Sequence, residues 1–294
     1  MLTRRDLIAA SAAMPLSAAA GTMHLCLHQT TSAGSSFRAS LEGYARAGIR
    51  YVELIPPLVD EFLKYESVAA AKRLLADLGL QAVSMGGPRG LAEPNAGRAD
   101  ALEQLKRIAS PAADLGVDRV VCPCGTTEKF TREDYARGVE NLREAGEIVR
   151  PLGVTAMLEF MRGSTFIGTL STSLKMTRQA AHPSVRSMLD CYHFWAGLSK
   201  FEDLDLVRDG EIHHVHFQDV PDIPREQLDN ATREIPGEGV SPLVRILRKL
   251  AEKGYRGALS VELFYPQLQN GDPYEVARRI RSKAEPILEQ AGVL

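Results

Sequence analysis

The chain of 294 residues has no excess of charge of either sign, since 35 Lys and Arg nearly balance 37 Asp and Glu and leave a net charge of −2. A nucleic-acid-binding surface needs a marked positive excess, so this balance argues against such a partner. No run of about 20 apolar residues is present, which excludes an ordinary membrane-spanning helix. At 45% hydrophobic residues, however, the chain can build a large folded core.

Cysteine is also scarce, with four residues in the whole chain. Cys122 and Cys124 lack the C-x-x-C spacing of a zinc site, and no second pair follows them. Together with Cys26 and Cys191, they fall in or beside expected strands, where a small thiol packs well. We therefore expect buried, reduced thiols and no disulfide framework.

The first 22 residues differ in composition from the rest. Arg4 and Arg5 precede a short Ala-rich apolar run that ends near Ala20. This pattern resembles a twin-arginine export signal, and its apolar run is too short to span a bilayer. We expect residues 1–22 to be a leader that directs the protein to the periplasm. The alternative is a cytoplasmic protein with a helical extension, or with Met23 as its first residue.

A repeated unit organises the remaining chain. Five glycines each end a helical pattern and precede a short apolar run: Gly48, Gly79, Gly116, Gly153 and Gly254. Glycine suits the left-handed residue that ends a helix, and short bounded apolar runs are typical of buried parallel strands. The first four glycines are 31 or 37 residues apart, about the length of one strand and one helix. We predict one domain over residues 23–294, a (β/α)8 TIM barrel.

The expected strands centre on residues 25–28, 51–55, 82–85, 120–122, 156–159, 187–190, 214–217 and 259–262. Amphipathic patterns predict helices over residues 37–47, 68–78, 99–115 and 135–149, and further helices begin near Pro242 and Pro273. Residues 164–170 and 220–239 are expected to be loops.

Four consecutive expected strands end in an acidic residue or a histidine: Glu159, Asp190, His216 and Glu262. The carboxyl ends of barrel strands meet at one rim, where the chemistry of such barrels takes place. Buried carboxylates this close together repel one another unless a cation neutralises them. Three carboxylates and one imidazole suit manganese first, with magnesium, cobalt and zinc as alternatives. We therefore predict a divalent-metal site.

The chain also resembles the xylose-isomerase-like barrels of the sugar phosphate isomerase/epimerase family, in the AP endonuclease family 2 superfamily. The resemblance covers essentially all of residues 23–294. It is carried by residues 189–193, 214–219 and 233–239 and by the strand that ends at Glu262. It implies that the four rim residues are the metal ligands, and that His193 and Arg233 hold substrate oxygens.

The resemblance implies a sugar isomerase or epimerase that moves a proton next to a carbonyl through a metal-stabilised enediolate. Glu159 and Glu262 are the expected acid/base pair, because their strands approach the reacting carbon from different sides. Arg233 would face the developing oxyanion charge. The substrate would be a small carbohydrate, and the family implies a homodimer or homotetramer.

Five more residues are candidates for supporting roles. Trp195 is a candidate platform on which a sugar stacks. Glu53 and His28 end early strands and either contact substrate or simply lie near the rim. Asp219 either orients a ligand or caps a turn. His214 is expected to support the metal ligand two residues later by hydrogen bonding.

Three other functions compete with the isomerase. A lyase or dehydratase acting on keto-sugars, keto-inositols or 3-keto-glycosides would use the same metal and bases to expel a substituent. A non-catalytic exported carbohydrate-binding barrel would have no need for two opposed carboxylates. A type IV apurinic endonuclease holds three metals with extra histidines, which residues 84–87 and 122–124 do not offer.

Overall fold

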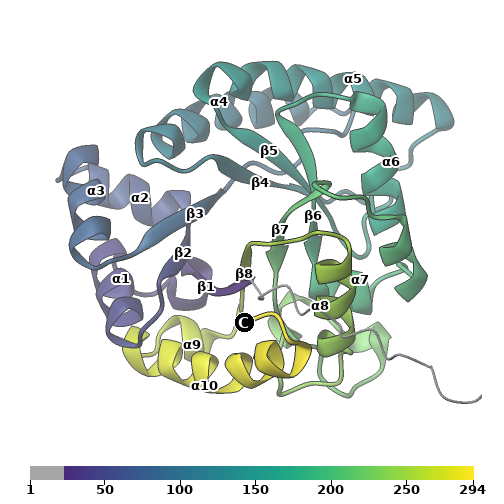
Figure 1. Cartoon of the computed structure of the whole chain (residues 1–294). Helices are drawn as coiled ribbons and strands as arrows, with labels where there is room; N and C mark the ends of the chain where they lie inside the picture. The colour runs from purple at the N-terminus through teal and green to yellow at the C-terminus, as the bar shows by residue number, and fades with distance from the viewer. Residues whose placement is uncertain (1–22) are drawn as a thin grey trace, which may run out of the picture.

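The structure is a computed structural model that describes residues 23–294 as one closed barrel of eight parallel strands surrounded by helices (Figure 1). Strands that are neighbours in the chain are neighbours in the barrel, and β8 pairs with β1 to close it. The predicted (β/α)8 barrel is confirmed. The leader predicted for residues 1–22 lies outside the described residues and stays a prediction.

The strands lie within two residues of the expected positions. They are β1 (His24–His28), β2 (Tyr51–Leu54), β3 (Gln81–Gly86), β4 (Arg119–Cys124), β5 (Thr155–Phe160), β6 (Val185–Asp190), β7 (Ile212–His216) and β8 (Ala258–Val261). The α-helices are α1 (Phe37–Arg46), α2 (Pro56–Leu63), α3 (Val68–Asp77), α4 (Arg98–Asp114), α5 (Arg132–Val149), α6 (Leu170–Ala180), α7 (Cys191–Ala196), α8 (Leu243–Glu252), α9 (Pro266–Gln269) and α10 (Pro273–Ala291).

The glycine pattern that predicted the strands has the expected backbone conformation. All five glycines have positive φ angles, from 63° at Gly79 to 84° at Gly254, so each turns the chain at a helix end. The expected loop at 220–239 contains two 3₁₀ turns, η4 (Arg225–Gln227) and η5 (Asn230–Thr232). The four cysteines are buried and free, as expected.

Side chains on the strands alternate between the barrel interior and the surrounding helices. Outward residues such as Leu158, Leu189 and Val215 belong to the main apolar core beneath the helices. The lower interior is filled by two small apolar clusters, one of which is formed by Val121, Met157 and Met188. Two residues after Met157 on β5 and Met188 on β6, the next inward side chains are Glu159 and Asp190 at the carboxyl rim. On these two strands, acidic side chains at the rim therefore follow buried methionines.

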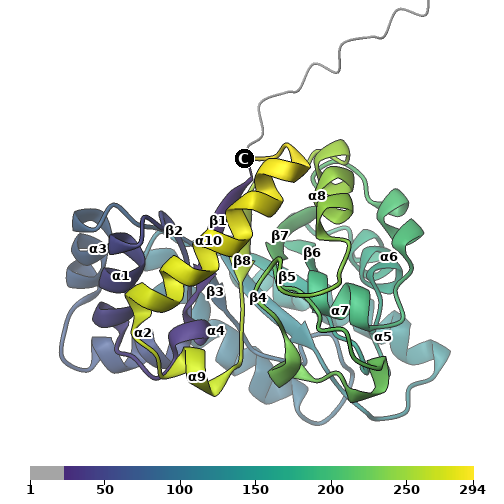
Figure 2. The same ribbon diagram turned by 90° about the horizontal axis from the view of Figure 1, so that it is seen from below.

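The carboxyl rim and the C-terminus of the chain lie at opposite ends of the barrel (Figure 2). In Figure 2, α9, which follows β8, is at the lower end, and the C-terminus is at the upper end. Among residues 23–294, no helix is long and apolar enough to cross a membrane.

Candidate metal centre

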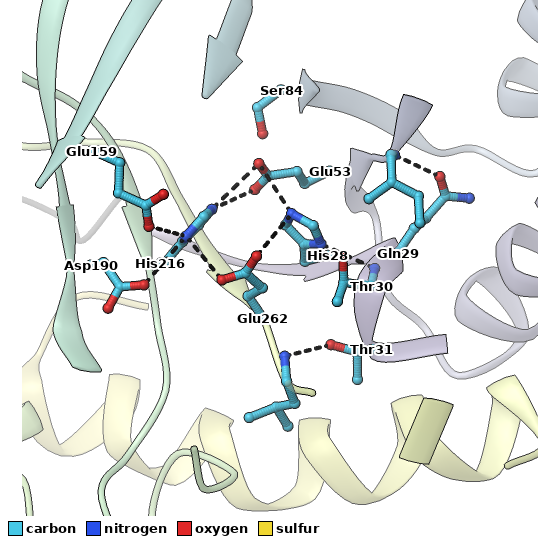
Figure 3. A network of polar contacts seen from close by, with 12 residues as sticks. His28, Gln29, Thr30, Thr31, Glu53, Ser84, Glu159, Asp190, His216 and Glu262 are labelled. Carbon is cyan, nitrogen blue, oxygen red and sulfur yellow. Dashed lines mark hydrogen bonds and ion pairs between the residues drawn. The ribbon is translucent and has the colours of Figure 1, made fainter. Parts of the chain in front are cut away.

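Four side chains from four neighbouring strands converge at the carboxyl rim. One ligand atom from each of Glu159, Asp190, His216 and Glu262 lies within 4.8 Å of the corresponding atoms of the other three. His216 Nδ1 is 3.2 Å from Glu159 Oε1, 3.5 Å from Asp190 Oδ2 and 3.5 Å from Glu262 Oε2 (Figure 3). Three carboxylates and one imidazole nitrogen form a donor set suited to a divalent cation. The geometry thus fits the predicted ligand set.

Arg233 is the permanent positive charge beside these carboxylates. Its Nη1 donates to Asp190 Oδ2 at 2.9 Å and to Glu262 Oε2 at 2.6 Å. The guanidinium is 2% exposed and lies over the rings of Tyr192 and Phe264, at 4.9 and 5.0 Å from their centroids. Buried charges are stable only when paired, so Arg233 and the carboxylates depend on one another.

The two carboxyl groups predicted to transfer protons have different pKa values, because their environments differ. Burial raises the pKa of Glu159 to about 7, although its hydrogen bond to His216 opposes the shift. Burial would also raise the pKa of Glu262, but Arg233 and then His216 outweigh it and lower that pKa below its usual range. Near neutral pH, Glu262 is therefore a charged base, whereas Glu159 can hold a proton. In many enzymes the pKa values of the catalytic acid and base are pushed apart in this way.

Asp219 holds the loop that carries Arg233. Its carboxylate accepts backbone N–H groups from Val220, Gly237, Gly239 and Ser241 at 2.8–3.1 Å. A side chain at Gly239 would put its Cβ 2.3 Å from the carbonyl oxygen of Val220, so only glycine fits. Of the two roles open for Asp219, the structure shows the turn-capping one. The glycines of residues 233–239 thus serve to position Arg233.

His193 stands beside Arg233 with an unusual pattern of donors. Its Nδ1 accepts the backbone N–H of Arg162 at 3.2 Å, and burial lowers its pKa to about 4, so the ring is neutral. The single ring proton is then on Nε2, which lies 3.1 Å from Arg233 Nη2, itself a donor. Two donors that face each other are satisfied by an acceptor, and a substrate oxygen would provide one.

The structure places Glu53 and His28 beside the ligand cluster, where both side chains are buried. Glu53 is fully buried, and its carboxylate faces His28, His214 and His216. His214 Nε2 is 2.7 Å from Glu53 Oε2, so His214 supports the site through Glu53. His28 Nε2 is also 3.6 Å from Glu262 Oε1, which connects it to the cluster.

Trp195 and Gln218 are two further residues near the site, one predicted from the sequence and one not. Trp195 packs against a satellite cluster that includes Tyr192 and Leu228, and the Arg225 guanidinium lies 5.2 Å from its ring centroid. Its role as a sugar platform stays a prediction. Gln218, which sequence reasoning missed, donates to Asp190 Oδ2 at 2.7 Å. Its place two residues after His216, on the inward alternation of β7, was the available signal.

A divalent cation that binds here must compete with protons. The pKa of Glu159 is raised to about 7, and the pKa of His216 is raised well above its usual value, because the pull of Glu53 and Glu262 outweighs burial. Below pH 7 both groups hold protons that the metal has to displace. Each displaced proton contributes up to about tenfold in affinity per pH unit. We expect affinity for Mn²⁺ to rise about 10- to 100-fold from pH 6 to pH 7.

Isothermal titration calorimetry in two buffers with different ionisation heats measures both the affinity and the number of protons released. Proton release on binding at pH 6 agrees with the raised pKa values. An affinity that is the same at pH 6 and pH 8 contradicts them.

Comparison with known proteins identifies the family to which this barrel belongs. The chain belongs to the xylose isomerase-like TIM barrel family, whose sequence model matches residues 41–284. Inosose isomerase of Halalkalibacterium halodurans is 31% identical over 255 residues, which cover 83% of this chain and 89% of that protein.

Other relatives have different activities in their names. The 3-dehydroshikimate dehydratase of Pseudomonas putida is 27% identical over 249 residues, which cover 80% of this chain and 37% of that protein. A solved structure of the IOLI protein with a zinc atom has a TM-score of 0.85 at 24% identity, and the match covers 92% of this chain and 99% of that one. That likeness shows a shared fold.

Proposed function

We propose that this protein is a divalent-metal-dependent isomerase or epimerase of keto-sugars or keto-inositols, with manganese as its metal. The observation that carries the proposal is the convergence of Glu159, Asp190, His216 and Glu262 within 4.8 Å of one another. The similarity to inosose isomerase supports a cyclic or open-chain polyol ketone as substrate. Two carboxylates with separated pKa values favour proton transfer over simple binding.

The residues of the site divide the work between them. A divalent cation held by the four side chains would supply a Lewis acid beside the substrate carbonyl. Glu262, which is charged near neutral pH, would take a proton from the adjacent carbon. Glu159 would deliver a proton from the side of β5, because its raised pKa makes it the carboxylate of the pair that regains a proton more readily once the metal has displaced the first one. General acid/base groups of this kind contribute about 10²- to 10⁴-fold to rate.

Substrate oxygens would be held by the two facing donors, His193 Nε2 and Arg233 Nη2. Both side chains are buried, so their hydrogen bonds act in a low-dielectric environment where they are strong. The ion pairs of Arg233 with Asp190 and Glu262 fix its guanidinium before substrate arrives. This preorganisation would stabilise negative charge as it develops on the substrate oxygen.

A lyase is the second candidate, and the similarity to 3-dehydroshikimate dehydratase favours it. Isomerisation and elimination share the first step, in which the proton next to the carbonyl is removed. They diverge when the intermediate either regains a proton or expels a substituent on the next carbon.

Incubation of the Mn²⁺-loaded protein with inososes, ketohexoses and 3-keto-glycosides in deuterated water tests the proposal by NMR. We expect deuterium to enter the carbon next to the carbonyl, without loss of a substituent. The exchange should stop when a chelator removes the metal and resume when Mn²⁺ is restored. Loss of water or of a glycosidic substituent would favour the lyase. Equal exchange with and without metal would contradict both enzymes.

A further inference from the structure

Glu53 is a carboxylate surrounded by three imidazoles inside the barrel. Its side chain is fully buried, and its oxygens lie 3.5 Å from His28 Nε2, 2.7 Å from His214 Nε2 and 3.2 Å from His216 Nε2. An ionised carboxylate has acceptor oxygens only, so each ring nitrogen that faces Glu53 would donate an N–H group to it.

The hydrogen bonds of the two outer histidines fix where their protons are. His28 Nδ1 accepts the backbone N–H of Thr30 at 3.0 Å, so the proton of its neutral ring is on Nε2, toward Glu53. Among residues 23–294, His214 Nδ1 has no hydrogen-bond partner, whereas its Nε2 faces Glu53.

His216 lies between Glu53 and the metal cluster. Its Nε2 faces Glu53, at 3.2 and 3.4 Å from the two carboxylate oxygens, and its Nδ1 faces the carboxylates of the cluster (Figure 3). A ligand nitrogen must present a lone pair, which requires the proton to be on the other ring nitrogen. We propose that Glu53 is a positioning residue that keeps the proton of His216 on Nε2 and presents Nδ1 to the metal. This inference rests on the proposed metal-dependent function.

The same proton assignment argues against a second metal in the barrel. His28, Glu53 and His216 also bring ligand atoms within 4.8 Å of one another. A metal there would need a lone pair on His28 Nε2, but the bond from Thr30 to Nδ1 leaves a proton on that nitrogen. His28, Glu53 and His216 therefore form a hydrogen-bond network that supports the single ligand set beside it.

The Glu53→Gln variant tests this role, with Mn²⁺ alone as the probe. An amide keeps the shape of the side chain but replaces one acceptor by a donor, which opposes an imidazole N–H. Loss of such a supporting carboxylate typically weakens metal binding about 10- to 100-fold, and we expect a calorimetric Kd for Mn²⁺ weakened by that factor. Glu93→Gln is the matched control, because Glu93 is also a buried carboxylate, 1% exposed, but belongs to neither group of possible metal ligands among residues 23–294. Its Kd should equal that of the wild type.

A Kd of Glu53→Gln within twofold of the wild type, in folded protein, overturns the inference. Wild-type protein that binds no Mn²⁺ overturns the proposed function together with it. Wild-type protein that binds Mn²⁺ but exchanges no substrate proton removes the proposed function alone.

A second measurement does not depend on the variant folding. Long-range proton–nitrogen NMR spectra of the Zn²⁺-loaded wild type, labelled with ¹⁵N-histidine, report the state of each ring nitrogen. We expect one histidine, absent in His216→Gln, with a metal-bound Nδ1 and a protonated Nε2. A metal-bound Nε2 in that histidine would contradict the role of Glu53.

Discussion

Replacement of Glu262 by Gln should reduce turnover of the substrate identified by NMR by about 10²- to 10⁴-fold. An amide can neither take nor return a proton, but its oxygen can still accept the hydrogen bond that Arg233 Nη1 makes to Glu262 Oε2. The variant should therefore fold and retain measurable affinity for Mn²⁺, although that affinity will be weaker. Steady-state kinetics at saturating Mn²⁺ and calorimetric metal titration separate the two effects.

The control for this variant is Glu211→Gln. Glu211 is also a partly buried carboxylate paired with an arginine, Arg178, at 2.7 Å, but it lies just before β7, at the opposite end of the barrel. Its turnover should match the wild type. Normal turnover by Glu262→Gln would show that Glu262 transfers no proton in the reaction.

Replacement of Arg233 by Met should destabilise the metal-free protein by about 3–5 kcal/mol, because it leaves buried carboxylates without their cation. For a domain of this size, that loss lowers Tm by roughly 10 °C. Burial contributes to the effect, since Asp190 is fully buried and the side chain of Glu262 is 13% exposed. Mn²⁺ should restore much of the lost stability, because a bound cation neutralises the same carboxylates.

Thermal unfolding of the variant with chelator and with Mn²⁺ measures both parts of this prediction. Arg107→Met is the control, because Arg107 and its partner Asp60 are 59% and 46% exposed. An exposed ion pair of that kind is worth less than about 1 kcal/mol. If metal-free Arg233→Met unfolds at the wild-type temperature, the carboxylates do not depend on Arg233.

The barrel could be predicted from the sequence because its repeat is local. Each strand follows a glycine or another helix end, and each apolar run is short and bounded. The helix α2 (Pro56–Leu63) was missed, although Pro56 and Pro57 at its start are a signal for a helix N-terminus. The pattern placed Glu262 in the last strand as its final residue, whereas β8 ends one residue earlier, at Val261.

The set of four candidate metal ligands was also predictable. Strand alternation and strand order alone place them at one rim: Glu159, Asp190, His216 and Glu262. The direction of Glu53 was not predictable. Whether a residue at the end of β2 faces substrate or the histidines of β7 depends on how the barrel closes across its centre. The four backbone N–H groups on Asp219 likewise depend on a loop conformation that local propensity does not specify.

The most direct test of the central claim is anomalous X-ray diffraction from crystals of this protein soaked in Mn²⁺, at the manganese absorption edge. We predict one strong peak in the barrel, bonded to Glu159, Asp190, His216 through Nδ1, and Glu262. A barrel without a peak at these four side chains would contradict the claim, and so would a peak between His28 and Glu53.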